Sequence, residues 1–307
     1  MAAVKTRNTA TLMTEGSIVK SLLLFALPLI FGNLLQQMYN TADSIIVGNF
    51  VGSNALAAVG SSGSPIYLLI GFSQGLAVGA GVVVSQYLGA GDHKETREAV
   101  HTSLAIAVVM GLLLTVGGVA CGRALLVAMN TPAEVLADAV TYIRIYFGGV
   151  LFSVVYNMTA GILNAAGNSR RSLVYLAWAS VTNIVLDFVF IVGLRMGVAG
   201  AAIATVIGQV ATFVMAVSYM FRFKTFRIDR SAFRMKAKTC TTVLSLGVSS
   251  FITQFAITIV MALTNNLLVS YGALSIYGSE IPMTATGIVM KVNQILISIL
   301  VGIAVGA

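Results

Sequence analysis

The sequence predicts an all-α integral membrane protein that consists of a six-helix N-terminal lobe and the first two helices of a repeated second lobe. Three observations support this fold class. Hydrophobic residues make up 58% of the 307 residues and charged residues only 9%, whereas soluble domains carry about 25% charged residues. Eight apolar segments are long enough to span a bilayer. The last two of these segments also repeat features of the first two, which indicates a second lobe of the same kind.

Each predicted span has the roughly 20 mostly apolar residues that a helix needs to cross the hydrocarbon core. The eight spans are residues 17–50, 55–88, 98–121, 132–165, 172–194, 198–221, 240–271 and 282–307. Several are longer than this minimum, which indicates tilt, bends or ends that protrude into water. Pro28 and Pro65 are candidate bend points, because proline removes a backbone hydrogen-bond donor from a helix.

The Lys and Arg residues of the loops predict the orientation of the chain. Fourteen of the 18 flank the start of the first span or lie in the even-numbered loops, and only two lie in the alternate loops. Because cytoplasmic loops carry an excess of Lys and Arg, we expect residues 1–16 to be cytoplasmic in a multi-pass plasma-membrane protein. The two cysteines, Cys121 and Cys240, then lie on opposite faces of the membrane and cannot form a disulfide.

Seven of these cations lie in residues 222–239, which we interpret as a basic cytoplasmic linker between the lobes. Phenylalanines alternate with the basic residues there, and such a pattern also suits the binding of single-stranded nucleic acid by charge and stacking. The excess of positive charge in cytoplasmic loops already explains the linker, which would lie on anionic lipid. We therefore expect the lipid bilayer, and not nucleic acid, as its partner.

A sequence repeat relates the second span to the eighth. Gly75-Leu-Ala-Val-Gly-Ala80 recurs as Gly302-Ile-Ala-Val-Gly-Ala307, and the ladder Gly71, Gly75, Gly79 returns as Ser298, Gly302, Gly306. Close packing of helices in lipid would explain one such ladder taken alone. Six spans separate the copies, so residues 17–221 and 240–307 belong to lobes of the same orientation, related by an axis along the membrane normal. Because the second copy ends at residue 307, we expect that about four helices of a twelve-helix protein are missing.

Two acidic residues, Asp43 and Asp187, lie within apolar runs. A carboxylate there costs a few kcal/mol on insertion scales, so it should face the bundle interior or a water-filled cavity. Asn183 shares a helix face with Asp187, and a rise of about 1.5 Å per residue places Thr205 at a similar depth. Neighbouring carboxylates in a low-dielectric site also take up a proton readily. The alternative is that Asp43 lies in water at the outer boundary and Asp187 is a structural acid.

We predict a binding site for a proton or a hard cation such as Na⁺. It consists of Asp43, Asn183, Asp187 and Thr205. Other polar residues within the spans are candidates for a substrate cavity. These are Gln36, Tyr39, Asn40, Tyr142, Asn157 and Gln209, with Gln37, Tyr146 and Tyr156 as further members. Hydrogen bonds between helices explain such residues equally well. Arg144 and Lys291 lie inside spans, where each could contact a ligand or extend its charge towards the interface.

Four segments carry a family resemblance through their order and spacing. They are QQMYNTADSIIVG (36–48), ALAAVG (55–60), QYLGAGD (86–92) and GVAGAAIAT (197–205). Over residues 14–307 the chain resembles the multidrug and toxic compound extrusion (MATE) family, and looks closest to its bacterial DinF-type and related multidrug-export branches. The resemblance implies two six-helix lobes and the export of cationic, often aromatic drugs in exchange for H⁺ or Na⁺.

The resemblance also implies which residues form the cation site of the N-terminal lobe. The family uses aspartates on its first and fifth helices, an asparagine on the fifth and a threonine on the sixth. The matching positions in this sequence are Asp43, Asp187, Asn183 and Thr205. The chain departs from the family pattern because the last four helices are absent, and a full-length protein is expected to be a monomer.

We therefore predict a secondary multidrug antiporter, in which cation binding at the acidic pair weakens drug binding. A flippase for a lipid-linked precursor is the alternative, although it would require a strongly basic central cavity. An enzyme is disfavoured, because the two histidines, His93 and His101, lie near a cytoplasmic loop and no metal-binding or phosphate-loop motif occurs. We expect no catalytic residues and no cofactor apart from the coupling ion.

Overall fold

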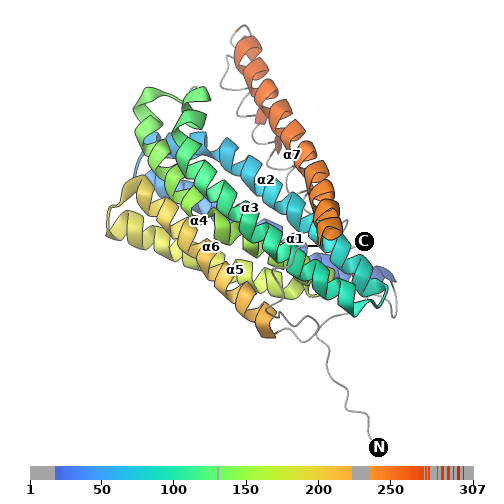
Figure 1. The fold of residues 1–307 in the computed structure, drawn as a ribbon. Helices are drawn as coiled ribbons and strands as arrows, with labels where there is room; N and C mark the ends of the chain where they lie inside the picture. The colour runs from blue at the N-terminus through green and yellow to red at the C-terminus, as the bar shows by residue number, and fades with distance from the viewer. Residues whose placement is uncertain are drawn as a thin grey trace, which may run out of the picture.

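The computed structural model describes residues 18–129, 131–222 and 236–272, together with individual residues between 274 and 300. In this part of the chain the structure contains seven α-helices, one π-helix and no strand. The helices are α1 (Ile18–Phe50), α2 (Ser53–Gly89), α3 (His93–Ala128), α4 (Ala133–Ala165), α5 (Ser169–Asp187), η1 (Phe188–Gly193), α6 (Gly197–Arg222) and α7 (Ala237–Gly272). Figure 1 shows α1 to α6 gathered into one bundle, with α7 against one side of it.

Six of these helices are long and apolar enough to cross a membrane. They are α2, α3, α4, α5 together with η1, α6 and the N-terminal part of α7. Within the described residues, α1, whose first residues are incompletely described, is not one of the six. The predicted all-α membrane fold class is confirmed. The eighth predicted span, 282–307, lies largely outside the described residues, as does most of the basic segment 222–239.

Helix α3 differs most from its prediction, which was residues 98–121. The helix begins at His93 because Asp92 caps it: one carboxylate oxygen of Asp92 accepts hydrogen bonds from the backbone N–H groups of Lys94 (3.2 Å) and Glu95 (3.0 Å). Such a cap supplies acceptors for N–H groups that have no partner within the helix. The first turn is therefore helical although it is too polar for hydrocarbon. Hydropathy predicts the part of α3 that can lie in lipid, but it does not predict the residue at which the helix begins.

Helix α2 packs against α4 on one side and α7 on the other. A Cβ atom added to Gly161 of α4 would lie 2.6 Å from the carbonyl oxygen of Ala77, and one added to Gly79 would lie 2.6 Å from that of Val243 in α7. Both separations are too short for any side chain, so the backbones of these helices approach closely only because of the glycines. Gly79, a member of the glycine ladder of α2, therefore serves the packing of helices.

Helices α1 and α5 are joined near both ends. The hydroxyl of Ser169 donates a hydrogen bond of 3.1 Å to the carbonyl oxygen of Phe25. Beyond the other end of α5, the rings of Phe50 and Phe188 pack edge to face with centroids 6.1 Å apart. Asp43 lies on α1 between these two contacts, which together hold this part of α1 against α5.

The chain changes its helical geometry directly after Asp187. Residues Phe188–Gly193 form the π-helix η1, in which the N–H of Leu194 donates to the carbonyl oxygen of Val189, five residues earlier, at 2.9 Å. Two residues with positive φ, Arg195 (54°) and Gly197 (59°), then turn the chain into α6. Short π-helical turns occur frequently at functional sites, and this one begins at a buried acid.

Candidate cation site and adjoining cavity

Two carboxyl groups meet in the interior of the bundle, between α1 and the end of α5. Asp43 is 9% exposed and Asp187 is completely buried. Their carboxyl groups lie within hydrogen-bonding reach of each other. Two buried carboxylates at this separation repel each other strongly unless a proton or a cation lies between them. The alternative from the sequence, an Asp43 in water at the outer boundary, does not fit this burial.

An amide and a hydroxyl complete the group of residues predicted from the sequence. Asn183 lies one helical turn before Asp187 and is 3% exposed, and its side-chain NH₂ donates to the Thr205 hydroxyl at 3.4 Å. Thr205 in turn donates to the carbonyl oxygen of Ala201 at 3.0 Å. Because the only hydroxyl proton of Thr205 is used in this way, its oxygen offers acceptor capacity to its surroundings.

The oxygens of this site lack hydrogen-bond donors. Among the described residues, Asp43 Oδ1, Asn183 Oδ1 and both carboxylate oxygens of Asp187 are buried without a hydrogen-bond partner. A buried acceptor without a donor is costly, and a buried carboxylate is more so. A proton shared by the aspartates would satisfy two of these oxygens, and a small cation would be a ligand for several of them.

The chemistry of these ligands also limits the cation. Carboxylate, amide and hydroxyl oxygens suit hard cations, whereas the described residues include no cluster of three or more His, Cys, Asp or Glu. Two carboxylates with two neutral oxygens form a small set of hard oxygen ligands, which suits a proton or a small cation.

A cavity of about 80 Å³ adjoins the site, because Asn183 and Thr205 belong to its wall. Its polar lining comes from five helices: Gln36, Tyr39, Gln74, Tyr146, Ser153, Tyr156, Asn157, Ser180, Asn183, Thr205, Gln209 and Thr212. The lining contains neither Lys nor Arg. Pockets for drug-sized ligands usually measure about 300–1,000 Å³, so in this conformation the cavity has room for an ion and a few waters only.

Four of the six predicted cavity residues line this space, namely Gln36, Tyr39, Asn157 and Gln209. The other two do not. Asn40 lies on an exposed part of α1, where Ser44 donates to its backbone carbonyl at 2.9 Å. Tyr142 is 5% exposed and close enough to Asp43 and Asp187 to interact with them electrostatically, so it belongs with the acidic pair.

Sequence reasoning missed Gln74, Ser153, Ser180 and Thr212, which also line the cavity. Gln74 has a usable signal, because it is a lone amide in the apolar, glycine-rich run of α2. Ser180 has none, since serine is common in membrane helices and its hydroxyl bonds within α5, to the carbonyl oxygen of Leu176 at 2.8 Å. Asn157 also has a structural role, as its NH₂ donates to Ser73 of α2 at 3.0 Å.

Comparison with known proteins relates this arrangement to one family. The MatE family model matches residues 28–189. The probable multidrug resistance protein YpnP of Bacillus subtilis is 31% identical over 261 residues, which cover 84% of this chain and 58% of YpnP. The probable multidrug resistance protein NorM of Thermotoga maritima is 24% identical over 266 residues, which cover 85% of this chain and 57% of NorM. The chain thus spans less than two thirds of the length of these relatives.

Solved structures agree with the sequence comparison. The outward-facing structure of a multidrug resistance MATE family transporter of the MOP superfamily superposes with a TM-score of 0.87 at 27% identity. The match covers 95% of this chain and 63% of that transporter. The arrangement of helices in the described part of the chain is therefore that of a large part of such a transporter.

Proposed function

This chain belongs to the MATE family of multi-pass membrane transporters, and we propose that it forms the larger part of a cation-coupled multidrug exporter of the plasma membrane. In this proposal α1 to α6 are the N-terminal lobe, α7 begins the second lobe, and the N-terminus lies in the cytoplasm. Its relatives are transporters and not enzymes. The exported compounds would be organic cations or aromatic drugs, exchanged for H⁺ or Na⁺.

One observation carries the proposal: buried oxygens without donors lie beside a polar cavity. Asp43 and Asp187 supply negative charge that nothing in the described protein neutralises by an ion pair. Asn183 contributes to both the acidic site and the cavity wall. A cation bound at the acids and a cationic drug in the cavity would therefore compete for the same negative charge.

Such competition is what antiport requires. Each ligand can shift the conformational equilibrium only by its difference in affinity between the states, and the coupling between two ligands is reciprocal. When the site is loaded with H⁺ or Na⁺, the attraction for a cationic drug falls and the drug is released. When the drug binds, the inorganic ion leaves. The small volume of the cavity means that the drug-loaded state requires a wider arrangement of the helices around it.

A binding experiment tests this proposal with the purified chain. We would measure the affinity of ethidium, a fluorescent aromatic cation, by fluorescence anisotropy at increasing Na⁺ concentration and, separately, at decreasing pH. One of the two series should weaken ethidium binding to the wild type by about tenfold or more. Asp187→Asn should remove that dependence, because the amide carries no charge and binds no proton.

Asp138→Asn is the matched control, since Asp138 is an exposed acid on α4. It should respond to Na⁺ and pH as the wild type does. Wild-type dependence in both Asp43→Asn and Asp187→Asn would refute the site.

A flippase for a lipid-linked precursor is the second candidate. Pyrophosphate recognition calls for basic side chains, and the cavity wall contains none. Arg144, one of the two cations predicted within spans, is exposed and does not line the cavity. The same anisotropy assay separates the two functions, because displacement of ethidium by a polyprenyl pyrophosphate, and not by a second organic cation, would favour the flippase.

A further inference from the structure

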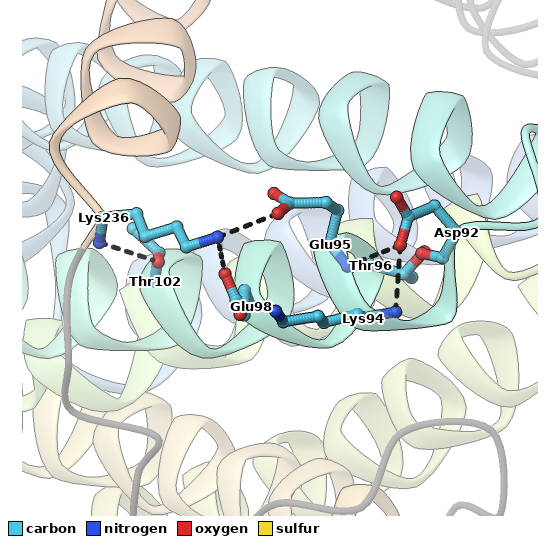
Figure 2. A network of polar contacts seen from close by, with 7 residues as sticks. All are labelled: Asp92, Lys94, Glu95, Thr96, Glu98, Thr102 and Lys236. Carbon is cyan, nitrogen blue, oxygen red and sulfur yellow. Dashed lines mark hydrogen bonds and ion pairs between the residues drawn. The ribbon is translucent and has the colours of Figure 1, made fainter.

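A network of charges joins the start of α7 to the first two turns of α3 (Figure 2). Lys236, the residue before α7, places its ammonium 2.9 Å from a carboxylate oxygen of Glu95 and in an ion pair with Glu98. The backbone N–H of Lys236 also donates to the Thr102 hydroxyl at 3.4 Å. Residues 95, 98 and 102 are spaced by three and four, so they lie on one face of α3. Lys236 therefore contacts one continuous face of the helix.

The two glutamates need this lysine. They lie one turn apart on α3, where like charges destabilise a helix. Asp92, the cap of α3, adds a third carboxylate to the same end. The partial positive charge of the helix N-terminus offsets some of this repulsion, and Lys236 is the side chain placed between Glu95 and Glu98. The Lys236 side chain is 44% exposed, so the pairs are accessible to water and can break and re-form.

Apart from this network, α7 is attached to the bundle mainly through α2. It packs principally against α2 and only briefly against α3. The α2 contact is a seam of glycines and apolar atoms, with Gly79 against Val243 and Gly247 against Leu76. Figure 1 shows the C-terminal end of α7 diverging from the bundle. The charged contact therefore adds to the glycine seam in holding the N-terminal end of α7 against the bundle.

We propose that Lys236, Glu95 and Glu98 form a latch that holds the first helix of the second lobe against the six-helix lobe, and that this latch opens whenever the lobes separate on that face. The inference rests on the proposed transport function, because transporters built from repeats work by rocking one repeat against the other. The face concerned carries the loop between α2 and α3 and is the one predicted to be cytoplasmic. A closed latch thus belongs to the state that is closed towards the cytoplasm.

A native cysteine, Cys240, can report on the movement of the N-terminal end of α7 away from α3. Cys240 lies one turn into α7, is half-buried, and donates its backbone N–H to the carbonyl oxygen of Lys236 at 2.9 Å. Cys121 is exposed and lies in the last two turns of α3, far along the helix from the latch. We would reconstitute the chain in nanodiscs, in which both faces are accessible, label it with a polar maleimide and measure the labelling of each cysteine by mass spectrometry. Opening of the latch should expose Cys240 and leave Cys121 unchanged.

Lys236→Met and the double variant Glu95→Gln/Glu98→Gln should each raise the labelling rate of Cys240 by about threefold. The charge reversal Lys236→Glu/Glu95→Lys/Glu98→Lys should bring the rate part of the way back to that of the wild type, because the ion pairs are restored but the positive end of α3 disfavours two lysines. Lys238→Met is the matched control: Lys238 is an exposed lysine two residues away, and no ion pair is seen for it in the described part of the chain. This control should label as the wild type does.

Three results would overturn the latch. They are a Cys240 rate in Lys236→Met equal to that of Lys238→Met, an equal rise at Cys121, and a reversal variant that labels as fast as Lys236→Met. If Lys236→Met fails to fold, the glutamine pair and the reversal variant still decide the question. Labelling needs neither drug nor ion gradient. Ethidium binding that is independent of cations would therefore refute the cation site without refuting the latch, and unchanged labelling would refute the latch without refuting the cation site.

Discussion

Two pairs of neighbouring acids in the described part of the chain, Glu95 with Glu98 and Asp43 with Asp187, lie in opposite environments. Glu95 and Glu98 lie at a helix end where water reaches them, and Lys236 supplies a fixed cation between them. Asp43 and Asp187 lie in the interior, where a charge is far more costly, and their oxygens face no donor among the described residues. Stability alone would favour a resident cationic side chain at the buried pair. A buried acidic pair without such a side chain fits a site that binds and releases a cation during its function.

The largest expected effect comes from removing the buried charge. Na⁺ or H⁺, whichever couples, should raise the wild-type free energy of unfolding by about 2.7 kcal/mol at one hundred times its Kd. Asp187→Asn should lose this gain, because the buried amide does not attract a cation. Thermal unfolding in detergent, with NaCl titrated against choline chloride and with pH varied separately, would measure it. Asp138→Asn should behave as the wild type, and a full cation response in Asp187→Asn would contradict the comparison.

Removing a neutral ligand should have a smaller effect. Asn183→Leu deletes the amide oxygen and the hydrogen bond to Thr205 but leaves both carboxylates in place. We expect cation affinity to fall about tenfold, equivalent to about 1.4 kcal/mol. The midpoint of the cation titration in the same unfolding assay gives the affinity. Ser180→Ala, a cavity position on the same helix, serves as control, and an unchanged midpoint in Asn183→Leu would remove Asn183 from the site.

At Glu95 and Glu98, which are partly exposed, the cap of α3 should matter more than Lys236. Asp92→Ala leaves the backbone N–H groups of Lys94 and Glu95 without their acceptor and should lower the free energy of unfolding by about 1 kcal/mol. It should also speed the labelling of Cys240, because Glu95 is positioned by the capped turn. Asp92→Asn keeps an acceptor and should recover most of the loss in both assays. Equal losses for alanine and asparagine would mean that the cap does not support the latch.

The smallest effect is expected at the lysine itself. Lys236→Met should lower the free energy of unfolding by about 0.6 kcal/mol, since exposed ion pairs contribute little. One molar choline chloride should abolish this difference from the wild type, because the Debye length falls to about 3 Å. The same salt should not replace the coupling ion at the buried pair. If choline chloride also abolished the effect of Asp187→Asn on the free energy of unfolding, the acidic pair Asp43 and Asp187 would be open to solvent.

Much of the fold can be predicted from the sequence, because apolar run length determines where a helix can cross lipid. Seven predicted spans correspond to helices of the described structure, and the family membership is confirmed. The extra turns of α3 were not predictable from hydropathy, since the cap at Asp92 stabilises a polar helix end. The π-helix after Asp187 leaves no sequence signal either, because its residues are as apolar as those of an α-helical span.

The site was predicted unevenly, for reasons that differ among its residues. Asp43 and Asp187 are conspicuous because charge is rare in an apolar run, whereas their meeting depends on how α1 packs on α5. Asn40 is as polar as Gln36 but lies on an exposed part of α1 and does not line the cavity. The ion pair of Lys236 with Glu95 joins residues 141 positions apart in sequence. No local pattern predicts a pairing of that kind, so only the structure reveals it.

The wide turn of η1 makes the register of α6 depend on chain length and not only on side chains. A π-helical turn accommodates about one residue more than an α-helical turn. Deleting one residue from this stretch would allow α5 to continue as an ordinary helix, and would rotate α6 relative to α5 by about 100°. Thr205 would then no longer face Asn183. Residues Phe188–Gly193 should therefore tolerate many apolar substitutions, but no insertion or deletion.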